Sequence, residues 1–548
     1  MKRCPKCERS YTDETLNFCL EDGEWLVDEG SDEAATAILG GDTAEHPTRT
    51  MSMVSAASRK PIVAGLFGLI LVTALGIAGY IYYGRSSSKQ ISSIAVMPFV
   101  NDSGNADVDY LSDGITETLI SSLSQIPNLN VKARSSVFRY KGKELNTETI
   151  GKELNVQAIL NGHVVQHSDR LAISAELIDV QNENVIWSEK YDRKQTDLIS
   201  FQSDIARDVS QKLRTKLSGA DEQKVAKSFT ANPEAYQLYL KGRYFWNKRE
   251  AKETEKAIEF YQQAIDHDPN YALAYAGLAE CYITAETSVA EQYPKVTAAA
   301  QKAIEVDPTL GEPHAALANI TDTYDLDYPR AEQEFKRAIE LSPHYATGHH
   351  WYGEFLAMQG RFDESFAEYR KALEIDPYSL AINTDLGMAY RWARQYDRAI
   401  EHLKKLEEMD PNYERTPYYL AAVYQDAGRF DDATAEFMKA LGKSGFPAQE
   451  LEADRKRLLD AVKKYGPVGY WKGLLEINRF GGNENVSAPL MAAFCARAGQ
   501  RDEALKWLEK SYENHEIGRL ALKVDAKWDN LRSDTRFIEL MKKIGFSN

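Results

Sequence analysis

The stretch 346-ATGHHWYGEFLAMQGRFDESFAEYRKALEIDP-377 decides the fold, and a similar stretch follows it at residues 380–411. Prolines mark the register, because Pro343, Pro377 and Pro411 recur at intervals of 34 residues. Each interval has room for two helices, and a unit of two helices cannot bury its apolar face alone. Copies must therefore stack on one another, so the period predicts a helical repeat array.

The copies share small residues in the first helix and bulky apolar residues in the second. The small residues are Gly353, Gly387 and Ala421, and the bulky ones are Tyr369, Leu403 and Phe437. This pattern resembles the tetratricopeptide repeat, and the resemblance implies a mostly α fold, an α-solenoid. We expect about six repeats at 232–443, an irregular helical pair at 446–480, a further repeat at 485–515 and a terminal cap at 521–545.

An array of this kind does no chemistry by itself, but it presents a long concave surface to a protein or peptide partner. The first helix of each repeat lines that surface in the family. The candidate partner-binding residues on it are His350, Glu354, Thr384, Met388, Arg391, Trp392, Tyr418 and Gln425. Each of them could equally pack between repeats. The Lys/Asn pattern with which some members clamp a peptide carboxylate is not evident at these positions, so the partner stays unnamed.

Composition and motifs exclude several other functions. The chain carries 82 Asp and Glu against 66 Lys and Arg, a formal net charge of −16, whereas general nucleic-acid binding needs clustered positive charge. It has no Gly-rich phosphate loop, no His-Glu-x-x-His and no Gly-x-Ser-x-Gly. We therefore expect neither an enzyme nor a nucleic-acid-binding protein.

A cluster of cysteines stands at the N-terminus. Cys4 and Cys7 form a Cys-x-x-Cys pair, and Cys19 follows with Asp22 three residues later. Three thiolates and one carboxylate can complete a tetrahedron around one Zn²⁺ ion. Residues 1–28 resemble a short zinc ribbon in which Asp22 stands where a fourth cysteine is usual. Glu21 or water could replace Asp22 as the fourth ligand, and a degenerate ribbon without metal is the alternative.

An anchor is predicted between the ribbon and the rest of the chain. Residues 29–60 are rich in Ala, Thr, Ser, Gly and acids, as in a disordered linker. Residues 61–83 contain no charge and are long enough to cross a bilayer as one helix. Small residues spaced four apart within them would allow dimerisation. Because a thiolate zinc site favours a reducing compartment, we place the N-terminus in the cytoplasm and residues 90–548 outside a bacterial inner membrane.

Residues 91–217 show an α/β pattern. The expected strands are 94–100, 129–133, 158–166, 172–179 and 184–191, and the expected helices are 109–126, 147–154 and 197–217. His163 and His167 share one face of a strand, with no carboxylate expected in register, so a solvated face is favoured over a metal or pH site.

The segments IAVMPFVNDSG, DYLSDGITETLISSLSQIPNLNVKARSS and VIWSEKYDR within this region resemble the TolB amino-terminal-like domain. In that bacterial family the domain often follows a transmembrane helix and precedes tetratricopeptide repeats. The part before the membrane is commonly a Ser/Thr kinase, a nucleotide cyclase or a winged-helix domain. Here the ribbon-like segment stands in that place, so the resemblance implies the sensor or scaffold half of such proteins.

Three functions remain open at this point. The first is a membrane-anchored protein-interaction scaffold or sensor whose repeat groove lies outside the inner membrane. The second is a signalling or transcription-linked regulator whose zinc ribbon contacts a cytoplasmic partner. The third, the weakest, is a hydrolase within residues 91–217.

Overall fold

The computed structural model describes residues 91–105, 108–126, 128–143, 146–213, 230–248, 251–285, 287–477 and 487–546, together with strand residues 2–3, 10–11 and 27–28. The chain forms two compact units, Met1–Ser88 and Lys89–Asn548. In the first unit, three short strands form an antiparallel sheet in the order β2-β1-β3. They are β1 (Lys2–Arg3), β2 (Ser10–Tyr11) and β3 (Val27–Asp28).

Several predictions fall on residues that the structure does not describe. These are the zinc ligands Cys4, Cys7, Cys19 and Asp22, the linker 29–60 and the membrane helix 61–83. Among the described residues, no helix combines the length and the apolar character that crossing a membrane requires.

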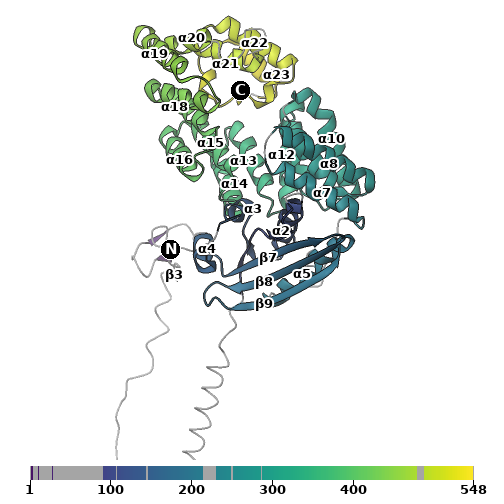
Figure 1. The fold of residues 1–548 in the computed structure, drawn as a ribbon. Helices are drawn as coiled ribbons and strands as arrows, with labels where there is room; N and C mark the ends of the chain where they lie inside the picture. Colours follow the sequence, from purple (N-terminus) through teal and green to yellow (C-terminus); the bar gives the residue numbers. More distant parts are fainter. Residues whose placement is uncertain are drawn as a thin grey trace, which may run out of the picture. The chain divides into compact units, whose positions relative to one another are not determined.

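The second unit begins with a six-stranded sheet in the order β6-β4-β7-β8-β9, in which β5 also pairs with β7. Its strands are β4 (Ser93–Val96), β5 (Val100–Asn101), β6 (Asn130–Val131), β7 (Ala158–His167), β8 (Arg170–Asp179) and β9 (Val185–Lys194). The pairs made by β4 and β5 are parallel, and β8 runs antiparallel to both of its neighbours, β7 and β9. Figure 1 shows the three long strands side by side.

Alternation along β8 explains which face of the sheet carries the core. Leu171, Ile173, Ala175 and Leu177 are buried, whereas the residues between them are half-buried. Helices α2 (Asp109–Ser124) and α5 (Leu198–Lys212) contact each other and the sheet. The shorter helices of this region are α3 (Arg134–Phe138) and α4 (Thr147–Leu154).

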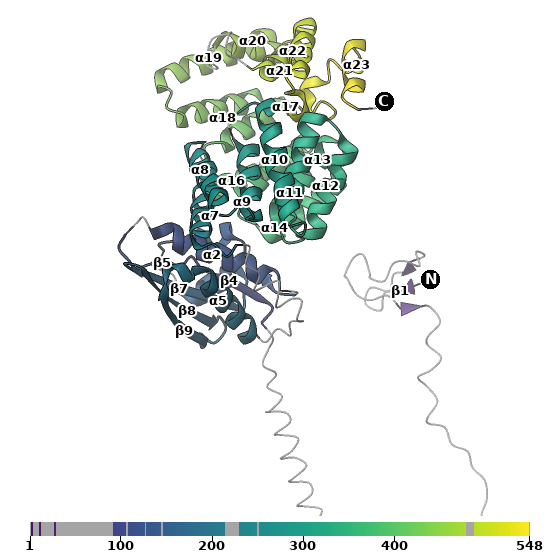
Figure 2. The ribbon, with the colours of Figure 1, turned by 90° about the vertical axis from the view of Figure 1, so that its right-hand side faces the viewer.

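Helical hairpins follow the sheet, and Figure 2 shows how they stack. The first six pairs are α7 (Pro233–Trp246) with α8 (Ala251–His267), α9 (Ala272–Thr284) with α10 (Val289–Val306), α11 (Glu312–Ile320) with α12 (Tyr328–Leu341), α13 (Ala346–Met358) with α14 (Phe362–Ile375), α15 (Leu380–Trp392) with α16 (Tyr396–Met409), and α17 (Thr416–Asp426) with α18 (Phe430–Lys443). Two further pairs are α19 (Ala448–Tyr465) with α20 (Pro467–Ile477), and α21 (Ala488–Arg497) with α22 (Arg501–Glu513). The predicted mostly helical solenoid after a small α/β region is thus confirmed.

The small residues of the repeat pattern have a clear physical role. A Cβ atom at Gly353 would lie 3.1 Å from the ring of Tyr369, and one at Gly387 would lie 2.7 Å from Leu403. The two helices of these hairpins approach so closely that a larger residue would push them apart. Packing within one hairpin therefore sets the sequence period.

The chain ends in a compact segment, residues 515–546, which we call the C-terminal segment. It contains η4 (Ile517–Arg519), η5 (Ala526–Trp528) and α23 (Thr535–Lys543). Trp528 is fully buried, and its indole N–H donates to the carbonyl oxygen of Leu520 at 3.0 Å. Its apolar residues share one core with α21 and α22.

Candidate functional site

Most of the eight predicted partner-binding residues are engaged within the chain. His350 and Thr384 are buried, and the His350 Nε2 atom lies 2.7 Å from a carboxylate oxygen of Asp385. The Gln425 side chain donates to the hydroxyl of Tyr470 at 3.1 Å. Glu354 and Met388 are half-buried, and Tyr418 is the exposed member of the set.

The C-terminal segment occupies the surface formed by Arg391 and Trp392. Asp525 lies 3.4 Å from the Arg391 guanidinium and accepts a hydrogen bond from the Trp392 indole at 3.3 Å. Lys527 contacts the same carboxylate at 3.1 Å, and Asp426 contacts Arg391 at 2.6 Å. The Arg391 side chain is only 7% exposed, so this part of the predicted groove is filled by the chain itself.

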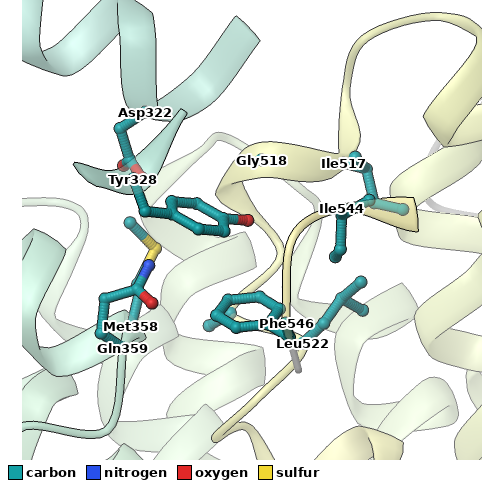
Figure 3. Close-up of a pocket in the computed structure, with 10 residues that line it drawn as sticks. Asp322, Tyr328, Met358, Gln359, Ile517, Gly518, Leu522, Ile544 and Phe546 are labelled. Atoms are coloured by element: carbon teal, nitrogen blue, oxygen red, sulfur yellow. The ribbon is translucent and has the colours of Figure 1, made fainter. Parts of the chain in front are cut away.

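A second contact between the C-terminal segment and the repeats lies nearby. The rings of Tyr328 and Phe546 stack with centroids 4.8 Å apart, and Figure 3 shows them between Met358 and Ile544. The hollow that remains there measures about 10 Å³, the lower limit for one water molecule. A Cβ atom at Gly518 would lie 2.2 Å from the carbonyl oxygen of Thr323, so backbone meets backbone here. This closed contact leaves no room for a ligand.

Two carboxyl groups beside this contact, those of Glu354 and Asp322, have raised pKa values. Burial and the negative charge of Asp385 raise the pKa of Glu354 to about 7. Burial and the nearby Glu354 raise the pKa of Asp322 well above its usual value, although Arg519 of the C-terminal segment opposes this. Within the described part of the chain, no three His, Cys, Asp or Glu side chains are grouped to hold a metal ion.

An open pocket of about 520 Å³ lies elsewhere, between α2 and α5 of the α/β region and the first repeats. We call it the junction pocket. Four tyrosines contribute to its wall: Tyr236, Tyr239, Tyr271 and Tyr345. None of the eight residues predicted from the sequence lines it. A signal was present in α7, where Tyr236, Tyr239 and Arg243 follow one another at helical spacing and so share one face.

Charged side chains connect the α/β region with the repeats at this pocket. The Arg243 guanidinium of α7 donates to Glu117 of α2 at 2.7 Å and to Glu280 of α9 at 3.4 Å. Glu117 also accepts from Asn247 at 2.8 Å, and Glu280 accepts from the hydroxyl of Tyr345. Burial alone would lower the pKa of Arg243, but these carboxylates raise it well above its usual value. The guanidinium is therefore charged and held by acids on two sides.

Two polar atoms of the pocket wall lack a hydrogen-bond partner among the residues that the structure describes. One is Nε2 of Gln202, a side chain that is 5% exposed and whose other amide atom accepts from the hydroxyl of Tyr236. The other is Oε2 of Glu312, and burial raises the pKa of this carboxyl. An unpaired buried polar group costs about 1–3 kcal/mol. Both atoms are covered in this structure, so a bound molecule would reach them, and recover that free energy, only if the two side chains turned toward the pocket.

Comparison with known families divides the chain in the same way as the fold. Residues 89–208 match the family of the HilA/YgeH-like transcriptional regulator, second domain. Residues 248–286, 324–379 and 392–445 match tetratricopeptide repeat families. The repeat resemblance inferred from the sequence is thus confirmed, whereas the resemblance to the TolB amino-terminal-like domain stays a prediction.

Individual relatives cover only parts of the chain. "Putative adenylate cyclase 3" of Rhizobium meliloti is 34% identical over 234 residues, which are 41% of this chain and 39% of that protein. "Transcriptional regulator HilA" of Salmonella typhimurium is 29% identical over 133 residues, 23% of this chain and 24% of that protein. The chain thus spans about two fifths and one quarter of these relatives.

One solved structure that matches part of the chain comes from "Functional Characterization of Pseudomonas Aeruginosa pilF". It is 20% identical, with a TM-score of 0.30, and the match covers 39% of this chain and 94% of that one. Taken together, the chain joins a region similar to the second domain of HilA/YgeH-like regulators to a series of tetratricopeptide repeats.

Proposed function

We propose that the chain is a protein-interaction scaffold, and that the junction pocket is where it receives a segment of its partner. The observation that carries this proposal is an open pocket of about 520 Å³, two of whose lining residues, Gln202 and Glu312, carry buried polar atoms without a partner among the described residues. Pockets that bind small ligands typically measure about 300–1,000 Å³. This one is large enough for a few side chains of an extended segment.

The C-terminal segment makes the junction pocket a better docking site than the later repeats. Asp525 and its neighbours cover Arg391 and Trp392, the two residue types in the predicted groove that most often anchor interfaces. A partner would have to displace a buried ion-pair network to reach them. The junction pocket requires no such displacement, so we place the docking surface at the first repeats and not at the later ones.

Peptide display on the full chain in detergent tests the proposal. Random linear peptides are selected on the chain, and their affinities are then measured on Ser122→Trp and on Ser188→Trp. Ser122 is half-buried in the pocket wall, whereas Ser188 is exposed on β9, outside that wall. We expect an indole at Ser122 to weaken the selected peptides by about tenfold or more, because it fills the space that they need.

The Ser188→Trp variant controls for the added indole and should bind like the parent. Melting temperatures of both variants show whether either one has lost its fold. If the selected peptides bind Ser122→Trp, properly folded, as tightly as the parent, the junction pocket is not the docking site.

The location of the scaffold is part of the proposal and rests on the sequence. We propose that residues 61–83 anchor it in a bacterial inner membrane, with the N-terminus in the cytoplasm and residues 90–548 outside. The absence of charge from 61–83 supports this. A reporter enzyme fused after Asn548 should be active outside the cytoplasm, and activity confined to the cytoplasm would reverse the orientation.

A second candidate function is a regulator of transcription or signalling. The match of residues 89–208 to a domain of HilA/YgeH-like transcriptional regulators favours it. In this function the N-terminal segment would hold one Zn²⁺ ion with Cys4, Cys7, Cys19 and Asp22 and contact a cytoplasmic partner. Three thiolates and a carboxylate are a donor set that suits zinc.

Replacing Cys4 and Cys7 with serine tests this second function. We expect zinc in the purified chain to fall from about one ion to none, because two of four ligands are lost. RNA sequencing of cells that carry the variant should then show changed transcript levels. Unchanged transcripts despite the loss of zinc would exclude the regulator, and full retention of zinc would exclude the metal site.

A further inference from the structure

The wall of the junction pocket is strongly biased toward negative charge. Its charged residues are Glu117, Glu280, Glu312, Glu340 and Arg243, four carboxylates against one guanidinium. Arg243 is already held by Glu117 and Glu280. Glu340 is exposed and pairs with Arg337, so the charge that an anionic ligand would meet comes mainly from the other three carboxylates, which outnumber Arg243. In a partly enclosed space electrostatic interactions are stronger than in water. The pocket therefore suits a cation.

Four tyrosines also line the pocket. The centroids of Tyr239 and Tyr271 lie 5.1 Å apart, and those of Tyr236 and Tyr239 lie 6.5 Å apart. Aromatic faces attract ammonium and guanidinium groups through the negative charge above the ring. The tyrosine rings and the carboxylates of the pocket thus both favour a cationic ligand.

The carboxylates of the pocket differ in how well they are already satisfied. Glu117 accepts hydrogen bonds from Arg243 and Asn247, and Glu280 accepts from Tyr345. Glu312 stands at the first turn of α11, and its Oε2 atom has no partner among the described residues. It is the carboxylate best placed to receive a new positive charge.

The amide of Gln202 adds a second requirement. Its Nε2 atom is a donor without a partner among the described residues, and the side chain is 5% exposed. A simple amine offers no acceptor to this donor. A polypeptide offers both a cationic side chain and backbone carbonyl oxygens, so a protein segment satisfies the wall better than a free amine does.

We propose that the junction pocket binds a protein segment through one lysine or arginine side chain. Its cationic head pairs with Glu312 and a neighbouring backbone carbonyl accepts from Gln202, once these two covered side chains turn toward the pocket. This assignment rests on the proposed function, because it names the chemistry of the segment received there. Glu312 is the residue that distinguishes a basic segment from others.

The peptides selected on the full chain provide the test. Those that depend on Ser122 should share one basic position, and changing it to norleucine should weaken binding by about tenfold or more, because a charged hydrogen bond is lost. Glu312→Gln should weaken the lysine or arginine peptide by a similar factor. On Glu312→Gln, replacing the basic residue of the peptide with norleucine should weaken binding little further, because the two changes remove the same interaction.

Glu340→Gln is the matched control. Glu340 also lines the pocket, but its side chain is 69% exposed and pairs with Arg337 at 2.7 Å. The same loss of charge there should change affinity by no more than about twofold, as for exposed ion pairs. Melting temperatures confirm that each variant is folded.

Two results would overturn this inference while leaving the proposed function in place. In the first, peptides that depend on Ser122 share no basic position. In the second, norleucine costs as much on Glu312→Gln as on the parent, so that the cation pairs elsewhere. Peptides that ignore Ser122→Trp altogether would instead reject the proposed function, and this assignment with it.

Discussion

Asp525→Ala is expected to lower the free energy of unfolding by about 3–5 kcal/mol, the usual effect of removing one partner from a buried ion pair. The Asp525 side chain is 1% exposed and contacts Arg391, Lys527 and Arg497 at 3.4, 3.1 and 3.9 Å. Alanine would leave these cations in the protein interior with Asp426 as their remaining counter-charge. It would also remove the acceptor of the Trp392 indole. Urea unfolding followed by tryptophan fluorescence measures the change.

Asp529→Ala is the control for this change, since Asp529 lies in the same segment and pairs with Arg394 at 2.9 Å. Its side chain is 52% exposed, so we expect a change of less than about 1 kcal/mol. If Asp525→Ala lowers the free energy of unfolding as little as Asp529→Ala does, the C-terminal segment does not stay docked on the repeats.

The contribution of Asp525 should also depend on pH in a defined direction. Burial alone would raise its pKa, but Arg391 and Lys527 bring the pKa below the ordinary value of 3.8. A carboxyl group with a lowered pKa in the folded state stabilises the fold above its unfolded pKa and loses this effect as the pH falls. The difference between the parent and Asp525→Ala should therefore be full at neutral pH and shrink only below about pH 4.

Contacts between residues close in sequence were the predictable part of the fold. Gly353 faces Tyr369 within one hairpin, and β7 and β8 pair through a short turn. Such contacts leave a periodic pattern, because each copy or strand repeats the same local packing. The bounds predicted for the helix at 147–154 agree with α4 for the same reason. By contrast, α3 is too short to show a period and was not predicted.

Contacts between distant residues left no such pattern. Arg391 meets Asp525 across 134 residues, and Glu117 meets Arg243 across 126. In the sequence each of these side chains resembles an ordinary surface charge. The sequence therefore indicated a binding surface that includes Arg391, but not that the chain's own end would cover it.

The side-chain contact of His163 is another one that the sequence pattern could not predict. No carboxylate was expected in register with it, and its cross-strand partners are indeed Val100 and Ser174, but a carboxylate outside the register contacts it. Strand β5 pairs with β7 so that Val100 lies opposite His163, and the turn after β5 brings Asp102 to 2.8 Å from the imidazole. A parallel pairing between separate segments decides this contact, and alternation within one strand cannot reveal it.

Arg243→Met is expected to lower the free energy of unfolding by about 3 kcal/mol, near the lower end for a broken buried ion pair. Methionine keeps much of the side-chain volume but leaves Glu280, which is 3% exposed, without its cation. Glu117 would keep Asn247 and the more distant Arg134, at 2.8 and 3.5 Å, which limits the loss. Urea unfolding again provides the measurement.

A second substitution separates charge from packing in this prediction. Arg243→Met combined with Glu117→Gln should recover part of the loss, because a neutral amide replaces an ion that has lost its main partner. Arg193→Met is the matched control, since Arg193 pairs with Asp204 at 2.9 Å and is 42% exposed, so it should cost less than about 1 kcal/mol. If both arginine variants cost equally little, the ion pairs at the junction do not hold the α/β region to the repeats. The pocket between them would then lack the fixed wall that binding requires.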